Sequence, residues 1–202
     1  MAFPRLNALS YWLIPPVAFG LLATPFLGGI ESGWTAYPPL SVLTESAQTF
    51  WNLSIITFGL SSIFSGLNFI VTIIFLRAPG MTWSRLPVFV WAMFATAFLA
   101  LMYTQGFATA LLMVTLDRVA GTVFFDASRG GDPLLYQHVF WFYSHPAVYI
   151  MVVPGFGVAL EVIGHFSRKP MFAYRYLVGG FLGIMGLSGI VWAHHMFTSG
   201  IP

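Results

Sequence analysis

The sequence contains no cysteine and very few charged residues. None of its 202 residues is cysteine, and only 7% are Asp, Glu, Lys or Arg. Without cysteine, disulfide bonds, thiolate metal sites and thiol catalysis are excluded as a basis for function. An average soluble domain carries about 25% charged residues, so a chain with so little charge belongs in lipid. The hydrophobic share of 58% and the aromatic share of 18% agree with a membrane protein.

Apolar segments long enough to cross a bilayer occur five times along the chain. A transmembrane helix needs about 20 predominantly apolar residues, and a backbone amide in hydrocarbon must be hydrogen-bonded within its own segment. We therefore expect an all-α fold, a polytopic transmembrane helix bundle that forms a single membrane domain over residues 1–202. The five expected transmembrane helices cover residues 7–27, 47–76, 87–116, 137–166 and 175–198.

The basic residues predict how these helices cross the membrane. Lys and Arg are enriched on the inner side of membrane proteins. Only Arg118 and Arg129 flank one set of helix ends, whereas the other set is flanked by Arg5, Arg77, Arg85, Arg168, Lys169 and Arg175. We therefore expect the N-terminus inside and the first, third and fifth helices running outward. The net charge of +2 then reflects orientation, and no nucleic-acid partner is expected.

Small and polar residues recur at helical spacing in two of the expected helices. In the second helix they favour either hydrogen bonding to a neighbouring helix or the wall of a hydrated proton path. In the fifth helix, glycines favour close backbone packing, with contact to a flat cofactor as the alternative. The polar residues are Ser54, Thr57, Ser61, Ser65, Asn68 and Thr72, and the glycines are Gly179, Gly180, Gly183, Gly186 and Gly189.

Three histidines are expected at similar depth in the outer half of the membrane. His145 and Tyr149 are four residues apart, so they share one face of the fourth helix. At about 1.5 Å per residue, His145 lies roughly 12 Å below the outer end of its helix, and His194 and His195 lie near the outer end of the fifth. Three neutral imidazoles without a thiolate or carboxylate suit copper, and tolerate zinc, iron or nickel. The remaining histidines, at positions 138 and 165, are expected at the interface.

Two long runs and several short ones resemble subunit I of the haem-copper terminal oxidases. Residues 142–149 read Phe-Tyr-Ser-His-Pro-Ala-Val-Tyr, with Pro-Gly-Phe-Gly at 154–157, and residues 192–198 read Trp-Ala-His-His-Met-Phe-Thr. Shorter matches occur at 1–7, 33–40, 124–126 and 130–133. The resemblance covers nearly the whole chain and implies a fragment of a twelve-helix domain, from its third to its seventh helix.

The resemblance implies a metal centre with defined neighbours. Tyr149 would be cross-linked to a copper ligand and would supply a proton and an electron to dioxygen, Trp141 would pack at the copper, and Trp34 would lie near a haem propionate. The implied copper ligands, beside a high-spin haem, are His145, His194 and His195. In the alignment the histidines that hold haem iron lie before residue 1 and after residue 202. The isolated chain is therefore expected to bind no haem and to reduce no oxygen.

The resemblance also implies a proton route that rises from the inner side. Many members of the family end this route with a Glu two residues after the first copper ligand, but this chain has Ala147. Tyr143 and Ser144, which come directly before His145, resemble a variant in which hydroxyl groups stand in for that carboxyl. Because a phenol titrates far above pH 7, proton transfer past Tyr143 would need a chain of water molecules. In a second route Leu160 replaces a common Ser, and Glu161 is a candidate substitute. The implied route residues are Asn7, Ser61, Ser62, Asn68, Tyr143 and Ser144.

The function implied by the resemblance is reduction of dioxygen to water at a haem-copper centre, coupled to proton translocation, with electrons from cytochrome c. Implied partners are the remainder of subunit I, oxidase subunits II and III, cytochrome c, dioxygen and the lipid bilayer. The implied location is the bacterial plasma membrane, with the mitochondrial inner membrane as the alternative. Other candidates are a quinol oxidase of the same superfamily, a metal-transporting membrane bundle, and a structural bundle with ordinary buried histidines. A nitric oxide reductase would place carboxylates near the metal.

Overall fold

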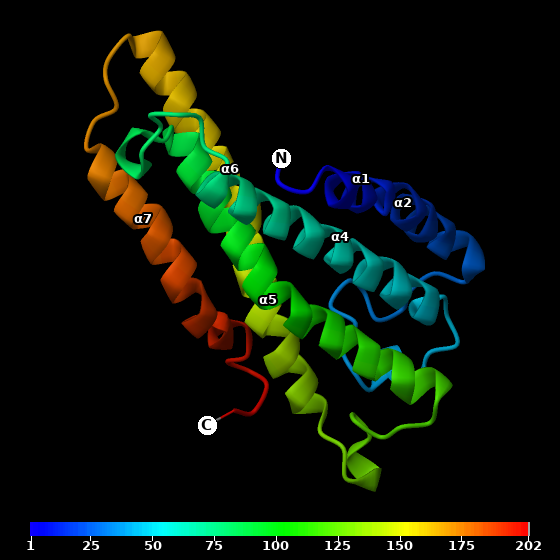
Figure 1. Ribbon diagram of the computed structural model, residues 1–202. Helices are drawn as coiled ribbons and strands as arrows, with labels where there is room; N and C mark the ends of the chain where they lie inside the picture. The colour runs from blue at the N-terminus through cyan, green and yellow to red at the C-terminus, as the bar shows by residue number, and fades with distance from the viewer. Residues whose placement is uncertain (202) are drawn as a thin grey trace.

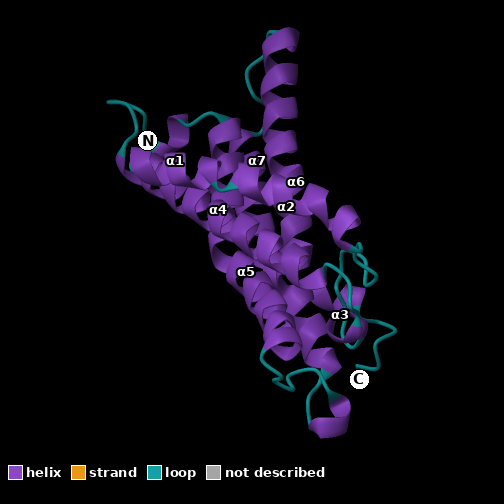
Figure 2. Cartoon of the chain, turned by 90° about the vertical axis from the view of Figure 1, so that its right-hand side faces the viewer, coloured by secondary structure: helices purple, strands orange, loops and turns teal. Residues whose placement is uncertain are grey.

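The apolar segments form long helices, as their composition requires. The computed structural model describes residues 1–201, and no strand occurs among them. Four helical segments are long and apolar enough to cross a membrane: Pro4–Leu27, α4 (Gln48–Phe75), α5 (Val88–Val119) and α6 (Pro133–Ser167). Figure 2 shows the described chain as helices joined by loops. The all-α membrane bundle expected from the sequence is confirmed.

The first of these segments is built from three consecutive helical pieces. They are α1 (Pro4–Trp12), α2 (Ile14–Ala23) and the 3-10 helix η1 (Thr24–Leu27). Prolines stand near the start of each piece. Proline has no backbone N–H and is tolerated in the first turn of a helix, but not within it. The prolines therefore divide the segment without ending its course across the bundle.

The last expected helix is shorter than the sequence indicated. Helix α7 (Tyr174–Leu187) has 14 residues, too few to span a bilayer as an α-helix. The chain continues as two 3-10 turns, η4 (Ser188–Ile190) and η5 (Trp192–His195). A side chain at Gly189 would collide with the hydroxyl of Tyr103 on α5, so glycine permits a close approach there and also weakens the α-helix. The prediction of one continuous helix over residues 175–198 is wrong, and the count of five crossing helices is not confirmed.

Helix α5 is the centre of the bundle. It packs along α4 on one side and α6 on the other, while α7 also lies against it. Helices α1 and α2 lie against α4 (Figure 1). The core between α5 and α6 contains Leu111, Val114 and Phe140, all fully buried. Because α6 begins with Pro133 after the capping carboxylate of Asp132, it starts four residues earlier than expected.

One end of the bundle collects the N-terminus and two loops. The amide of Ala2 donates to the hydroxyl of Thr72 at the end of α4. The hydroxyl of Tyr174, which begins α7, donates to the carbonyl of Leu86 just before α5. These contacts agree with helices that alternate in direction, and they gather at one end the six basic residues that flank it in the sequence. That this end faces the inner side of the membrane stays a prediction.

At the opposite end, Arg118 holds the loop that follows η1. Its guanidinium donates to the backbone carbonyls of Ser41, Val42, Thr44 and Ser46 and to the hydroxyl of Thr49. The loop includes the short helix α3 (Leu40–Leu43) and carries Trp34 and Tyr37. Arg118, which is partly buried, therefore fixes the loop that covers this end of α6 through several charge-assisted hydrogen bonds.

Candidate metal centre

His145 and Tyr149 lie one turn apart in the middle of α6. The His145 side chain is buried, and its ring lies 4.6 Å from the Tyr149 ring, centroid to centroid, in an edge-on arrangement. Because α6 begins at Pro133, His145 lies about 18 Å along the helix from that end, deeper than the 12 Å expected from the sequence. The shared face predicted for this pair agrees with the structure.

His194 and His195 are held against α6 by the 3-10 turn η5 rather than by a helix end. The indole Nε1 of Trp192 donates to Nδ1 of His138 on α6 at 3.3 Å. The Trp192 ring also packs edge-on against Phe142 of the same helix. His138 therefore accepts a hydrogen bond within the bundle, which the sequence did not indicate. The turn η5 is docked by these contacts with its two adjacent histidines facing His145.

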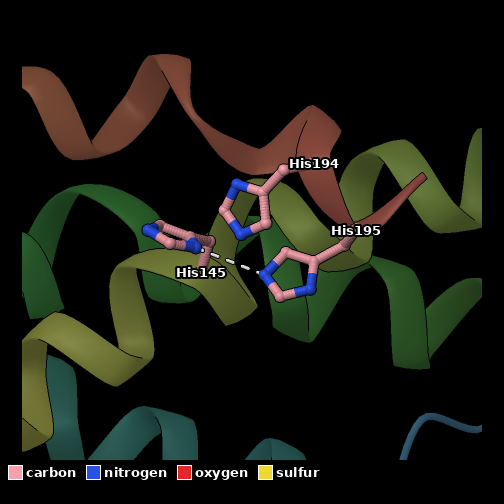
Figure 3. A group of neighbouring side chains, drawn as sticks. All are labelled: His145, His194 and His195. Carbon is pink, nitrogen blue, oxygen red and sulfur yellow. Dashed lines mark hydrogen bonds between the residues drawn. The ribbon is translucent and has the colours of Figure 1, made fainter. Parts of the chain in front are cut away.

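The three histidine rings converge, as Figure 3 shows. One ring nitrogen from each of His145, His194 and His195 lies within 4.8 Å of the others. Nδ1 of His145 and Nε2 of His195 are 3.2 Å apart, while the ring centroids of His145 and His194 are 4.4 Å apart. Residues fifty positions apart in the sequence thus supply three nitrogen atoms to one point.

The donor set of this cluster fits copper. It offers imidazole nitrogens alone, and softer thiolates or harder carboxylates are not part of it. The Nε2 atom of His145 is buried and has no hydrogen-bond partner among the described residues. A buried polar atom without a partner is costly unless something else bonds to it. Nε2 of His145 therefore has room for a partner beyond these hydrogen bonds, and the three nitrogens that converge, with Nδ1 of His145 among them, could hold a metal ion.

Trp141 and Tyr37 form a layer behind the cluster. The Trp141 indole stacks on the His195 ring, with centroids 3.8 Å apart and planes inclined by 4°. Its Nε1 donates to the hydroxyl of Tyr37 in the loop fixed by Arg118. Burial raises the pKa of Tyr37, and the hydrogen bond from Trp141 opposes that shift. No role for Tyr37 could be predicted from the sequence, because a loop residue more than a hundred positions from Trp141 shows no periodic relation to α6.

Trp34 lies at the edge of the same layer. Its ring is edge-on to Trp141 at 5.9 Å and tilted against Phe140 at the same distance. The side chain is 63% exposed. An indole that is packed on one side and open on the other is free to contact a further group, so the expected position next to a haem is compatible with its surroundings.

The polar side chains of α4 are bonded partly to α1 and partly to their own helix. Ser61 donates to the carbonyl of Ser10 at 2.6 Å, and the side-chain amide of Asn68 donates to Asn7 at 3.2 Å and accepts from the amide of Phe3. The sequence left two interpretations open, hydrogen bonding between helices and the wall of a proton path. For Ser61 and Asn68 the structure shows hydrogen bonding between helices. Ser54, Thr57 and Ser62 instead donate to carbonyls of their own helix.

The remaining candidates for proton transfer lie apart from that face. Tyr143 on α6 stacks on Phe107 of α5 at 4.9 Å, and Ser144 is buried beside it. Glu161, the candidate substitute for the missing polar residue at Leu160, accepts the amide of Phe89 at the first turn of α5. Glu161 is therefore used as a cap for a neighbouring helix, which satisfies one of its unpaired N–H groups.

The glycines of α7 mostly face open space. A Cβ atom added at Gly179, Gly180, Gly183 or Gly186 would meet no other atom within 4 Å. Close packing against another backbone of the described chain is therefore seen at none of the four. Gly189 alone of this set contacts a neighbour, the Tyr103 side chain.

Comparison with known proteins identifies the family. The family model for cytochrome c and quinol oxidase polypeptide I matches residues 1–202. The chain belongs to this family, as the resemblance in its sequence indicated, and is an integral membrane protein.

Individual relatives agree with the family match. Cytochrome c oxidase subunit 1 of Synechocystis sp. and that of Thermostichus vulcanus are each 51% identical to this chain over its whole length. A putative cytochrome c oxidase subunit 1-beta of Streptomyces coelicolor is 48% identical over 99% of the chain. The chain spans about 37% of the length of the first two relatives and about 36% of the third.

Proposed function

We propose that this chain forms the copper-binding part of the catalytic subunit of a cytochrome c oxidase, which reduces dioxygen to water and translocates protons across the membrane. The observation that carries the proposal is the convergence of three imidazole nitrogens beside a tyrosine within an apolar bundle. Ionisable groups inside a membrane bundle are functional candidates by default. The names of the relatives support an oxidase.

In this proposal His145, His194 and His195 hold copper next to a haem supplied from outside the described residues. Copper held there would exchange single electrons beside the haem iron. Trp141 keeps the His195 ring in one plane by stacking, and the packed walls of α5 and α6 exclude bulk water. Reduction of one dioxygen to two waters consumes four electrons and four protons, so protons must also reach the centre.

Tyr149 is proposed as a local source of one proton and one electron. Its ring is close to His145, whose Nε2 has no other partner among the described residues, so the proposed cross-link would form at an atom that is otherwise unsatisfied. Forming this carbon–nitrogen bond breaks one C–H bond of the Tyr149 ring and the N–H bond of His145, and the two protons and two electrons released would be taken up by dioxygen, the substrate of the proposed reaction. Mass spectrometry of the digested protein should find a peptide containing both residues that is lighter by two hydrogens, and Tyr149→Phe should abolish it. An unmodified peptide in active protein would contradict the cross-link.

The route proposed for protons begins at the polar face shared by α1 and α4 and reaches the hydroxyls next to His145. Its members are Asn7, Ser61, Ser62, Asn68, Tyr143 and Ser144. Tyr143 and Ser144 lie within one turn of His145 on α6. Their hydroxyls would replace the carboxyl that position 147 lacks, because residue 147 is alanine. Asn68→Leu should lower the rate of proton uptake on turnover in vesicles more than Ser65→Ala, a neighbour on the same face. Equal rates in the two variants would exclude the route.

The electron donor and the reaction are tested together on the complex purified from membranes with its partner subunits. Oxygen uptake should be supported by reduced cytochrome c and not by a quinol, and His194→Ala should abolish it. His165→Ala removes a histidine at the exposed end of α6 and should leave it unchanged. Uptake with quinol alone would favour the quinol oxidases that the family also contains. Metal that exchanges freely in the absence of any oxygen uptake would favour a metal transporter.

The proposal extends to partners and location. We expect the chain to work with the remaining helices of subunit I and with subunits II and III in a bacterial plasma membrane, as in an oxidase of the type named for its relatives. The isolated chain should show no haem absorption and no oxygen uptake. Detection of stoichiometric haem on it would contradict this division of ligands.

A further inference from the structure

A groove at the basic end of the bundle lies between the start of α5 and the start of α7. Figure 1 shows these two helix starts at the same end of the bundle. Its volume is about 310 Å³. Most of the lining is apolar or aromatic, and Arg175 stands at its margin. The residues that line it are Trp83, Ser84, Trp91, Tyr174, Arg175, Val178, Gly179 and Leu182.

The aromatic wall of this groove is held in place by hydrogen bonds and a cation–π contact. The indole Nε1 of Trp91 donates to the hydroxyl of Tyr174 at 2.9 Å, and that hydroxyl donates to the carbonyl of Leu86 at 2.6 Å. The guanidinium of Arg77 lies 4.1 Å above the Trp83 ring and donates to carbonyls at the end of α4. The wall is therefore preorganised and does not depend on a ligand to assemble it.

The cations around the groove lack acidic partners. Among residues 1–201 the only ion pair joins Arg129 to Asp126, at the opposite end of the bundle. Glu161 is the one carboxylate at the basic end, and it accepts the amide of Phe89. Arg175 lines the groove and is exposed. Arg85, which ends the 3-10 helix η2 (Trp83–Arg85), does not line the groove itself but directly follows Ser84 of the lining and is also exposed. The charge at this end is therefore complementary to an anion.

The shape of the groove requires more than an anion. Further along α7 from Arg175 the lining consists of Val178, Gly179 and Leu182, and a Cβ at Gly179 would meet nothing within 4 Å. An inorganic anion would leave this apolar surface uncovered. A ligand that carries a phosphate at one end and a hydrocarbon chain at the other covers both parts. Trp and Tyr at the rim are typical of the boundary between lipid headgroups and hydrocarbon.

We infer that this groove binds one anionic phospholipid. Its phosphate lies between Arg85 and Arg175, and an acyl chain runs along α7 over Gly179. Basic pockets between transmembrane helices on the inner side are suited to such headgroups, and indole rings at that depth accommodate the glycerol region. The site is independent of the metal centre, so it stands whether or not the proposed oxidase activity is correct.

Native mass spectrometry of the full complex, incubated with phosphatidylglycerol or phosphatidylcholine, tests the inference. Retention of phosphatidylglycerol should exceed that of phosphatidylcholine. The double variant Arg85→Gln/Arg175→Gln should weaken phosphatidylglycerol binding by about 30-fold, since each cation near the surface contributes about 1 kcal/mol. The matched control is Arg5→Gln/Lys169→Gln, which removes the same charge from the same end but leaves the groove intact. Equal losses in the two double variants would overturn the site.

A second pair of measurements separates a lipid from a polypeptide in the groove. Gly179→Leu fills the apolar part without touching the arginines, so it should reduce retention of phosphatidylglycerol while the surface charge is unchanged. A photo-crosslinking residue at Val178 should become attached to phospholipid in native membranes. Unchanged retention in Gly179→Leu would overturn the placement of the acyl chain in the groove, and attachment of Val178 to another polypeptide would show that a protein covers the groove instead.

Discussion

The two polar regions inside this apolar bundle differ in how their atoms are bonded. On the face that α4 presents to α1, Ser61 and Asn68 are paired with backbone and side-chain atoms of the neighbouring helix. At the histidine cluster, Nε2 of His145 has no partner among the described residues, and Nδ1 meets another imidazole. Paired polar groups join helices, whereas the converging nitrogens are arranged as the proposed metal site requires, and the unpaired Nε2 is the atom left for the proposed bond to Tyr149.

The largest effect should come from removing a ligand of the histidine cluster, and it should be a loss of copper affinity. His194→Ala removes one of three converging nitrogens, and the copper affinity should fall by more than about 100-fold, the upper range for losing a residue that only supports a ligand. His194 is exposed in this chain, so resistance to unfolding in detergent should change by no more than about 0.5 kcal/mol. Metal analysis after dialysis measures the first quantity. Stoichiometric copper in the variant would remove His194 from the site.

A smaller effect should follow when the layer behind the cluster is loosened. Tyr37→Phe deletes the acceptor of the Trp141 indole, so the indole is free to tilt away from the His195 ring. We expect a copper affinity about tenfold weaker, the lower range for residues that orient a ligand. The copper electron paramagnetic resonance spectrum should broaden as well. Tyr11→Phe, on the exposed face of α1, is the control; identical spectra in both variants would show that the hydrogen bond has no such role.

Substitutions of Glu161 test whether its carboxylate caps α5 or carries protons. It accepts the Phe89 amide at the start of α5, so Glu161→Ala should lower the free energy of unfolding by about 1 kcal/mol, as loss of a helix cap does. Glu161→Gln keeps an acceptor oxygen and should recover most of this loss. If Glu161 carried protons instead, both variants would slow proton translocation equally, and the Gln variant would give no recovery.

The smallest effect should come from removing a single hydrogen bond between α1 and α4. Ser61→Ala deletes a hydrogen bond to the carbonyl of Ser10, which should cost about 0.6 kcal/mol of unfolding free energy, the average for such bonds between membrane helices. Ser65→Ala on the same face removes a hydroxyl that bonds no other described residue, and should cost less. Copper content should stay unchanged in both. Loss of copper from Ser61→Ala would show that the polar face of α4 also affects metal binding, contrary to the separate roles proposed for the two regions.

The helical part of the fold could be predicted from the sequence because it follows from local chemistry. Backbone amides in hydrocarbon must be paired within their own segment, so the apolar stretches that became α4, α5 and α6 had one available structure. Errors at their ends came from capping. Asp132 and Pro133 start α6 before its apolar stretch begins. The 3-10 turns of residues 188–195 include Gly189, which lies too close to Tyr103 for any side chain, and no local pattern reveals this contact.

For the candidate site, the sequence by itself determined the residue types and their nearest neighbours. The spacing of His145 and Tyr149 places both on one helical face, and the pair His194–His195 is adjacent by necessity. Tertiary structure alone decided that η5 docks on α6 through Trp192, that Tyr37 supports Trp141, and that Glu161 caps α5. Each of these contacts joins residues more than fifty positions apart, and only the packed bundle brings such residues within hydrogen-bonding distance.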